Sequence, residues 1–452
     1  MNILIVGNGF DLSHYLPTKY DHFMVAMGAI ESWNELKGDM GFDDLFRADY
    51  WYKNDGTGEE WQNSFFQHTK AMYLTDEIKV SKEQVKELQN LLKENVWYQY
   101  FSDHVREVKT WIDFETKIED ALKLVCIGVY KIEEEYSKSG QFDLNIYTTA
   151  YKNSRGYQFS ELQIDLLALL KLFVKNQKFN VHVNNSYGRD IRAGSVSVDF
   201  FKVKEHPKYG FDSYKYLMFL QMQLENFIKI FNIYLEVIVS QLTRSHLLFI
   251  NGENWVAPDM IYSFNYTNTY QRIYNAVEVE YLHGSHGEQQ NIVLGISDLK
   301  DDFLKQIKAY GFTKYHQKLL KNTDYMFLKY NEKITKNCLQ WNKWDINKFD
   351  AEKLKFNQFR TNIYIWGHSL DVSDEVYINE IFTLNTNNED KNVRVTVYYF
   401  NQQANFDLLA NLIHILGKEK VEIWMKNKWL QFKENPKILT EDVITLKDLP
   451  KM

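Results

Sequence analysis

The sequence predicts an α/β fold, a mostly parallel sheet with a large helical insertion after its first strand. Three features of the chain support this prediction. It opens with a short apolar run closed by glycines, and a long stretch with helical periodicity follows, as far as residue 245. Beyond that point, short apolar runs alternate with helical or loop segments, which is the pattern of parallel strands joined by crossover helices.

Residues 2–6 are expected to form the first strand. Their sequence, Asn-Ile-Leu-Ile-Val, is nearly all apolar, as in a strand of a parallel sheet that is buried on both faces. Gly7-Asn8-Gly9 follows directly, which indicates a tight turn. The N-terminus therefore predicts a buried strand that ends in a turn.

The segment after this turn has the three- and four-residue spacing of apolar side chains that is typical of amphipathic helices. Ser81 with Gln84, and Ser160 with Gln163, have the spacing of capping boxes, in which the two side chains close the first turn of a helix. Residues 214–242 predict a further long helix or a broken pair of helices.

Six short apolar runs after residue 245 are predicted strands, each bounded by Gly, Asn, Asp or Ser. They are residues 247–250, 260–264, 279–282, 292–294, 363–366 and 393–399. We therefore assign residues 1–30 and 246–452 to an α/β domain, and residues 31–245 to a helical insertion domain. Residues 297–357 are a candidate for a second, smaller insertion.

Composition argues against several classes of protein. The chain has 53 Lys and Arg against 60 Asp and Glu, a formal net charge of −7, which argues against direct nucleic-acid binding. Its two cysteines, Cys126 and Cys338, support neither a disulfide framework nor a four-cysteine zinc site, so we expect a reducing, cytoplasmic location. The N-terminus lacks the features of a signal peptide, and polar residues interrupt the most apolar stretch, residues 216–242, so no membrane span is expected.

Glycines and small polar residues follow four of the predicted strands. Because the carboxyl ends of parallel strands meet at one edge of a sheet, these residues should lie together, where ligands bind in open α/β sheets. The four motifs are Gly7-Asn8-Gly9-Phe10-Asp11, Ser263-Phe264-Asn265, His283-Gly284 and Gly367-His368-Ser369.

Each motif has a functional and a structural interpretation. Glycines after the first strand let backbone amides approach a phosphate at a helix N-terminus, but an ordinary turn with Asp11 as N-cap has the same sequence. Asn265 could orient a water or a ribose hydroxyl, or form an Asx-turn. His283 could be a general base or a turn residue. Ser369 could contact a phosphate, while Asp371 or Asp374 would cap the helix that follows.

Further polar residues leave two interpretations open. Glu115 could point into the cleft from the helical segment, or be a solvated carboxylate. His14 could be a second acid–base group, or an exposed residue of the first helix. Asp298 could touch a ribose, or belong to a turn, and no partner can be named for His286 or His368.

The opening residues 5–20 resemble the start of the AbiH family of bacterial phage abortive-infection proteins. Residues 263–268, 283–284, 294–296 and 367–370 are similar to later motifs of that family, in the same order. Residues 111–115, Trp-Ile-Asp-Phe-Glu, resemble a further family element. The resemblance spans nearly the whole chain and implies a role in antiphage defence.

The same order of motifs is similar to sirtuins and their NAD-consuming relatives, which implies a Rossmann-like, sirtuin-like nucleotide-binding domain. By this resemblance Asn265 would hold the attacking water or the nicotinamide ribose, and His283 would be the catalytic base. The other residues that would contact NAD are Gly7, Asn8, Gly9, Phe10, Asp11, Ser263, Gly367, His368 and Ser369.

Two departures from the sirtuin pattern matter. The turn is Gly-Asn-Gly-Phe-Asp in place of Gly-Ala-Gly, so Asp11 brings a negative charge near the expected pyrophosphate. The chain also lacks a zinc-binding cysteine quartet, which makes a protein deacylase a poor fit.

The leading hypothesis is an NAD glycohydrolase that breaks the nicotinamide–ribose bond in antiphage defence, with NAD as its substrate and no metal. One alternative is a non-catalytic sensor of NAD or ADP-ribose that signals to a partner. Another is a metal-dependent phosphodiester hydrolase that uses Asp11, Asp371 and Asp374. The partners expected are a small nucleotide and either a second copy of the chain or another defence protein.

Overall fold

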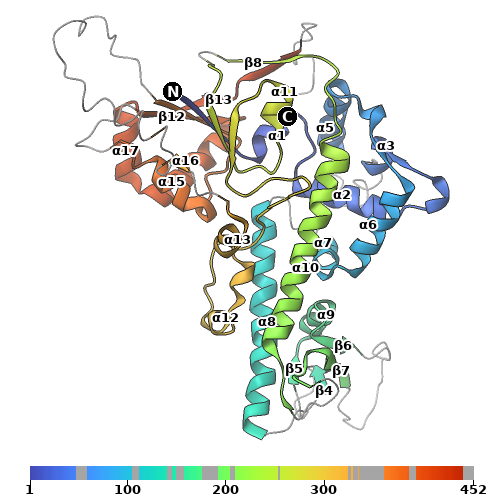
Figure 1. The fold of residues 1–452 in the computed structure, drawn as a ribbon. Coiled ribbons are helices and arrows are strands. Elements are labelled where there is room, and N and C mark those ends of the chain that lie inside the picture. Colours follow the sequence, from blue (N-terminus) through green and yellow to red (C-terminus); the bar gives the residue numbers. More distant parts are fainter. Residues whose placement is uncertain are drawn as a thin grey trace, which may run out of the picture.

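A six-stranded parallel sheet is the centre of the α/β part of the protein in the computed structural model (Figure 1). Its strand order is β10-β9-β1-β11-β12-β13, and every neighbouring pair is parallel. The strands are β1 (Asn2–Val6), β9 (Met260–Ser263), β10 (Glu278–Tyr281), β11 (Thr361–Trp366), β12 (Val393–Tyr399) and β13 (Leu430–Glu434). The predicted α/β class with a mostly parallel sheet is therefore confirmed.

The structure describes most of the chain. The described residues are 1–46, 59–103, 111–139, 145–148, 157–175, 192–203, 209–252, 255–323, 327–328, 334, 361–385 and 393–440.

Both faces of the central strand are buried, as its apolar sequence predicts. Ile3 and Ile5 pack with the side chains of the helices α15 (Glu375–Ile381), α16 (Gln402–Leu416) and α17 (Lys418–Lys426) on one face. Leu4 and Val6 pack on the other face, with α1 (Asn8–Ser13) and α11 (Thr269–Ile273). The sheet is therefore the middle of three layers, and successive residues of β1 belong to opposite layers.

Two of the predicted strands differ from the structure. Residues 247–250 form β8 (Leu248–Asn251), but it pairs antiparallel with β14 (Lys437–Thr440) in a separate two-stranded sheet. Residues 292–294 form no strand. Their backbone N–H groups donate to the side chain of Gln290, the carbonyl of His283 and the side chain of Gln317, and not to a neighbouring strand. The edge strand β13 was not predicted, because its Gln, Lys and Glu residues interrupt the apolar pattern.

Helices fill most of the segment between β1 and β8. They are α2 (Tyr20–Glu31), α3 (Phe42–Leu45), α5 (Glu59–Met72), α6 (Lys82–Glu94), α7 (Val96–Asp103), α8 (Trp111–Ser139), α9 (Glu161–Leu169) and α10 (Ser213–Tyr234). Both predicted capping boxes form, at the start of α6 and of α9.

The same segment also contains short strands that the sequence analysis missed. Strands β2 (Met40–Gly41) and β3 (Lys79–Val80) pair antiparallel. A four-stranded sheet has the order β5-β4-β7-β6. Its strands are β4 (Asn145–Thr148), β5 (Tyr157–Phe159), β6 (Phe173–Lys175) and β7 (Arg192–Val196). Runs this short are difficult to separate from helical periodicity, so the sequence analysis described this segment by its helices alone.

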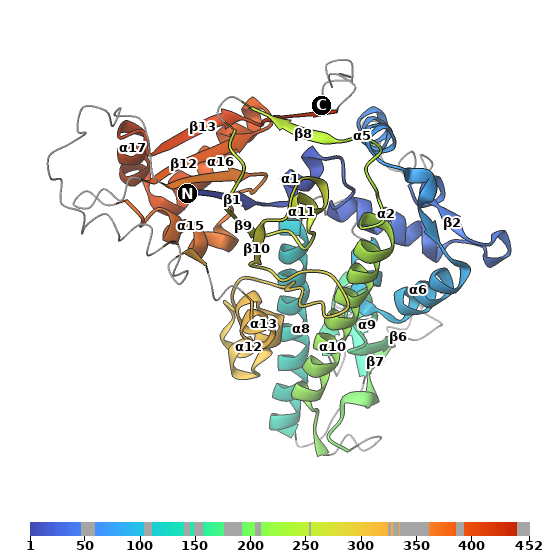
Figure 2. The same cartoon turned by 45° about the horizontal axis from the view of Figure 1, so that its top comes forward.

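Two long helices, α8 and α10, run side by side from the small sheet to the central sheet (Figures 1 and 2). The rings of Phe114 and Phe227 stack between them, with centroids 5.3 Å apart. Helix α10 continues into a π-helical turn, Leu235–Val239, so the predicted long helix of residues 214–242 is confirmed. The start of α8 and the end of α10 thereby reach the central sheet.

Helices α12 (Asp302–Gln306) and α13 (Lys314–Lys321) precede β11 in the chain and lie beside α8 (Figure 1). They belong to the predicted second insertion, residues 297–357, of which residues 335–357 lie outside the described residues. Within the described part of the chain, no helix combines the length and the apolar character that crossing a membrane requires.

Candidate functional site

A cavity of about 250 Å³ lies at the carboxyl ends of the central strands. Residues of all four strand-end motifs line it, so the prediction that these motifs meet at one edge is confirmed. The turns, loops and short helices that follow the strands contribute Gly7, Asn8, Asp11, Phe264, Asn265, Tyr266, Thr267, His283, Gly367, His368, Ser369, Ser373 and Asp374. Leu12, Thr18 and Lys19 follow the first turn, and Glu115, Phe231, Leu235 and Lys314 come from α8, α10 and α13.

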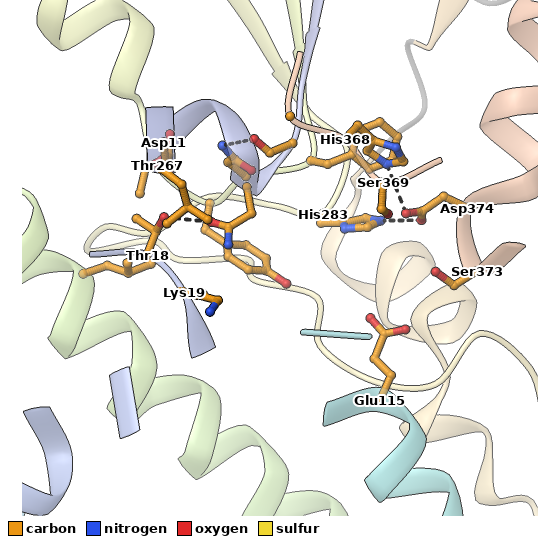
Figure 3. A pocket seen from close by; sticks show the side chains of 18 of the residues that line it. Asp11, Thr18, Lys19, Glu115, Thr267, His283, His368, Ser369, Ser373 and Asp374 are labelled. Atoms are coloured by element: carbon orange, nitrogen blue, oxygen red, sulfur yellow. Dashed lines mark hydrogen bonds and ion pairs between the residues drawn. The ribbon is translucent and has the colours of Figure 1, made fainter. Parts of the chain in front are cut away.

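Polar side chains gather on two opposite sides of this cavity (Figure 3). The first side carries Asp11, Thr267, Thr18 and Lys19. The second side carries His283, His368, Asp374, Ser373 and Glu115. A ligand that enters between them would therefore meet ionisable groups on both sides.

Gly7, Gly9 and Gly367 bring the turns after β1 and β11 into direct contact. A Cβ atom on Gly7 would lie 2.6 Å from the carbonyl oxygen of Gly367, and one on Gly9 would lie 2.7 Å from its Cα. The amides of Gly7 and Gly9 donate to the carbonyls of Trp366 and Gly367, at 3.1 and 2.8 Å. Because these N–H groups are already bonded, a bound phosphate would need other donors of the cavity.

Three predicted ligand contacts lie behind the cavity wall. Gly9 packs on Gly367, and Phe10 is buried in the core with its ring edge-on to Trp366, at 5.0 Å between centroids. Ser263 exchanges two hydrogen bonds with the backbone of Asn265, at 2.9 and 3.1 Å. These residues shape the turns that carry the lining residues.

Asn265 and Asp11 belong to the first side of the cavity. Asn265 donates from Nδ2 to the carbonyl of Gly7 at 2.9 Å, which ties the loop after β9 to the turn after β1. Thr267 donates to Oδ2 of Asp11 at 2.5 Å. Burial raises the pKa of Asp11 to about 6. Gly7 is the N-cap of α1, so the interpretation of Asp11 as N-cap is wrong.

Asp374 is the central group of the second side. Its Oδ1 lies 3.3 Å from Nε2 of His283, and its Oδ2 lies 3.3 Å from Nε2 of His368. Although burial opposes it, the charge of Lys314 and the contact with His283 hold the pKa of Asp374 well below its usual range. Asp374 is therefore an ionised carboxylate faced by two imidazoles, and its side chain does not cap the following helix.

His283 is a neutral imidazole at physiological pH. Burial lowers its pKa to about 3, helped by the charge of Lys318 and opposed by Asp374. Its ring also packs edge-on against Phe264, at 5.1 Å between centroids. Because Nε2 faces Asp374, Nδ1 is the nitrogen left to act on a ligand.

Glu115 and Lys314 form a buried ion pair, in which Nζ lies 2.6 Å from Oε1. Of the two interpretations left open for Glu115, the structure agrees with the one that places it at the cleft, because its side chain lines the cavity and is 13% exposed. Burial raises the pKa of Glu115 to about 7, against the attraction of Lys314. Burial alone would lower the pKa of Lys314, but Glu115 and Asp374 raise it, so the ammonium stays charged.

Lys314 was not predicted, because a lysine at the start of a polar helix is typical of a surface. Its position follows from the motif of residues 294–296. The carbonyl of Ile296 accepts the backbone N–H of Lys314 at 2.8 Å, which fixes the first turn of α13.

Comparison with known proteins identifies the family. The family model described as "Bacteriophage abortive infection AbiH" matches residues 3–399, which include all the lining residues of the cavity. The chain belongs to the AbiH family. Membership implies a role in abortive infection by bacteriophage. No curated protein and no solved structure matches the chain.

Histidines and acids outside the cavity have structural partners in this AbiH protein. His14 is fully buried, with Nδ1 2.7 Å from the carbonyl of Phe10 and Nε2 2.7 Å from the hydroxyl of Tyr274, so neither expectation for it holds. Asp298 is exposed and accepts the N–H of Leu299 at 2.7 Å, as a turn residue does. His286 contacts the carboxylate of Glu236.

The acids invoked for a metal-dependent hydrolase are separated in the AbiH structure. Asp371 accepts the N–H of Ser373 at 2.9 Å and caps a short 3₁₀ helix, as expected. Asp11 and Asp374 lie on opposite sides of the cavity (Figure 3). Among the described residues, no three His, Cys, Asp or Glu side chains are arranged to hold a metal ion.

Proposed function

We propose that this AbiH protein hydrolyses NAD at the nicotinamide–ribose bond and thereby depletes the cofactor during phage infection. The observation that carries the proposal is the buried cluster of His283, Asp374 and Glu115 at the carboxyl ends of parallel strands. That edge is where open α/β sheets bind nucleotides.

Hydrolysis of the nicotinamide–ribose bond requires few functional groups from the protein. As the bond between C1′ and the ring nitrogen breaks, the electron pair goes to nicotinamide and neutralises its positive charge, so the leaving group needs no proton. Positive charge develops on the ribose, and one water adds to C1′ with loss of one proton. The site must therefore hold the ribose, supply fixed negative charge and order a water. The ionised carboxylate of Asp374 supplies the fixed negative charge.

In this proposal Asn265 and His283 contact the ligand, with narrower roles than the motif resemblance implies. One N–H of Asn265 is bonded to Gly7, which leaves its carbonyl oxygen to accept a hydrogen bond from a ribose hydroxyl or a water. Neutral His283 offers Nδ1 for a hydrogen bond to the ligand, while its Nε2 faces Asp374 at 3.3 Å.

The size of the cavity suggests which half of NAD it takes. Its volume of about 250 Å³ is just below the 300 Å³ at which typical ligand pockets begin, roughly. The nicotinamide and its ribose fill such a space, and the adenosine half extends beyond it. The ammonium of Lys19, which also pairs with Asp21 at 3.1 Å, favours an anionic group on the first side.

A second function is favoured by one observation. A histidine whose pKa is about 3 is a weak base, and a site that binds NAD or ADP-ribose without hydrolysis needs none. In that case the protein senses a nucleotide and signals to a partner.

Nicotinamide release from NAD by the purified protein tests the proposal. Asp374→Asn removes the ionised carboxylate at nearly constant size, and Asp371→Asn in the same loop is the matched control, since Asn also caps helices. We expect release by the parent and by the Asp371 variant, and its loss in the Asp374 variant. His283→Ala and Asn265→Ala extend the series. Saturable ADP-ribose binding with no release by the parent would favour the sensor.

A further inference from the structure

Glu115 reaches the cavity from outside the sheet. It lies near the start of α8, in the segment inserted between β1 and β8, and its side chain is 13% exposed. The neighbouring Phe114 is fully buried and stacks on Phe227 of α10, which fixes this turn of the helix. The carboxylate is therefore held at the cavity by packing as well as by its ion pair.

One ammonium is shared by two carboxylates at this point. Nζ of Lys314 lies 2.6 Å from Glu115 and 4.0 Å from Asp374. Asp374 has two imidazoles beside it as well. A single positive charge cannot fully neutralise both acids, so Glu115 is the one that gains and loses a proton more readily.

The groups around Glu115 also indicate that it gains and loses a proton more readily than Asp374. Lys314 faces it from α13, Asp374 and Asp371 from the loop after β11, and Tyr266 from the loop after β9. Burial raises its pKa to about 7, and the charges of Asp374 and Asp371 act in the same direction. A carboxyl group that titrates near neutral pH is suited to acid–base catalysis.

We propose that Glu115 is a catalytic residue of the NAD hydrolysis proposed above, on which this inference rests: its carboxylate accepts the proton of the attacking water. The water oxygen bonds to C1′ as the bond from C1′ to nicotinamide breaks, and the electron pair leaves with nicotinamide. The proton moves to Glu115 and then to solvent, so the products are nicotinamide, ADP-ribose and one proton.

His283 is the less suitable base for this step. Its Nε2 is directed at Asp374, and its ring stays neutral to a pH far below that of the cell. It orients the ligand, whereas Glu115 takes the proton. The sheet thus supplies the ligand contacts and the inserted helix supplies the base.

Glu115→Gln tests this role, because glutamine keeps the size and can still accept a hydrogen bond from Lys314. Glu119→Gln is the matched control, one turn further along α8, where the glutamate pairs with Lys123 and Lys300 and lines a separate hollow. The measurements are nicotinamide release across the pH range in which a group of pKa about 7 titrates, and ADP-ribose binding by calorimetry.

We expect Glu115→Gln to lower turnover by about 10²- to 10⁴-fold, to remove the rise of activity with pH near neutrality, and to leave ADP-ribose binding unchanged. Glu119→Gln should match the parent in all three. An active parent with an equally active Glu115→Gln would overturn the role of Glu115 and leave the proposed function standing. Loss of turnover together with binding would show a structural role, and an inactive parent would remove both proposals.

Discussion

The imidazole of His368 lies between a backbone amide and the carboxylate of Asp374. Its Nδ1 accepts the N–H of Leu370 at 2.9 Å, and its Nε2 lies 3.3 Å from Oδ2 of Asp374. Because Nδ1 is an acceptor, the proton of the neutral ring is on Nε2, where it points at the carboxylate. His368 therefore fixes both the turn after β11 and the orientation of Asp374.

Replacement of His368 by alanine should destabilise the protein. The variant leaves the N–H of Leu370 and one oxygen of Asp374 without these partners, a loss of about 1–3 kcal/mol in the free energy of unfolding. Denaturant unfolding measures it, and His414→Ala on the exposed face of α16 is the control. Equal stabilities of the two variants would contradict the role given to His368.

Gly367→Ala should lower the stability of the protein far more than the same substitution at Gly417, where φ is similar. Gly367 has φ of +73°, and a Cβ there would lie 2.0 Å from the backbone nitrogen of Phe10. Gly417 has φ of +80° and ψ of 150°, with no atom near the added Cβ, so Gly417→Ala carries the conformational cost alone, about 1–3 kcal/mol.

Comparison of the two variants by thermal unfolding isolates the contact between the turns after β1 and β11. We expect Gly367→Ala to lose several times the stability that Gly417→Ala loses, or to fail to fold. A similar loss in both would mean that the two turns separate without cost.

The meeting of the strand-end motifs could be predicted because parallel topology alone requires it. Apolar runs identified β1, β9, β10, β11 and β12, and the residues that follow parallel strands share one edge. Asn265 and His283 were placed at the cavity on that ground. The argument needed no knowledge of side-chain partners.

The partners themselves could not be predicted, because they join elements that are far apart in the chain. Asp374 has the sequence context of a helix cap, yet it faces His283 and His368. Lys314 is the first residue of the polar helix α13, and its partner Glu115 belongs to α8, far away in the chain. No periodic pattern records such contacts, and the same limit hid the short strands of the inserted segment.

Asp11→Asn should stabilise the protein at neutral pH. The pKa of Asp11 is about 6 in the folded state, above its ordinary value of 3.8, so the folded state binds the proton more tightly and ionisation opposes folding as pH rises between these values. Asparagine removes this cost, which amounts to as much as about 3 kcal/mol above the window.

The free energy of unfolding of the parent and of Asp11→Asn, measured as a function of pH, checks this prediction. The gain should be present at neutral pH and disappear below a pH of about 3.8. Asp76→Asn, at an exposed position, should follow the parent throughout. A gain that does not change with pH would show that charge burial is not its cause.

Burial of neutral His283 should lower the free energy of unfolding as the pH falls, whereas burial of Asp11 lowers it as the pH rises. In the unfolded chain a histidine takes up a proton below a pH of about 6.5, whereas burial keeps His283 neutral in the folded state until about 3. The free energy of unfolding therefore falls as the pH drops through this window, since the unfolded state binds more protons. His14, with a pKa of about 4, adds a loss of the same sign.

His283→Gln removes one of these two contributions, so its stability should depend less steeply on pH than that of the parent, even though lost packing lowers its stability at neutral pH. Urea midpoints at a series of pH values measure the two slopes, with His414→Gln as the exposed control. Parallel slopes for the parent and His283→Gln would show that His283 takes up its proton at the same pH in the folded and unfolded states, so that burial does not shift its pKa.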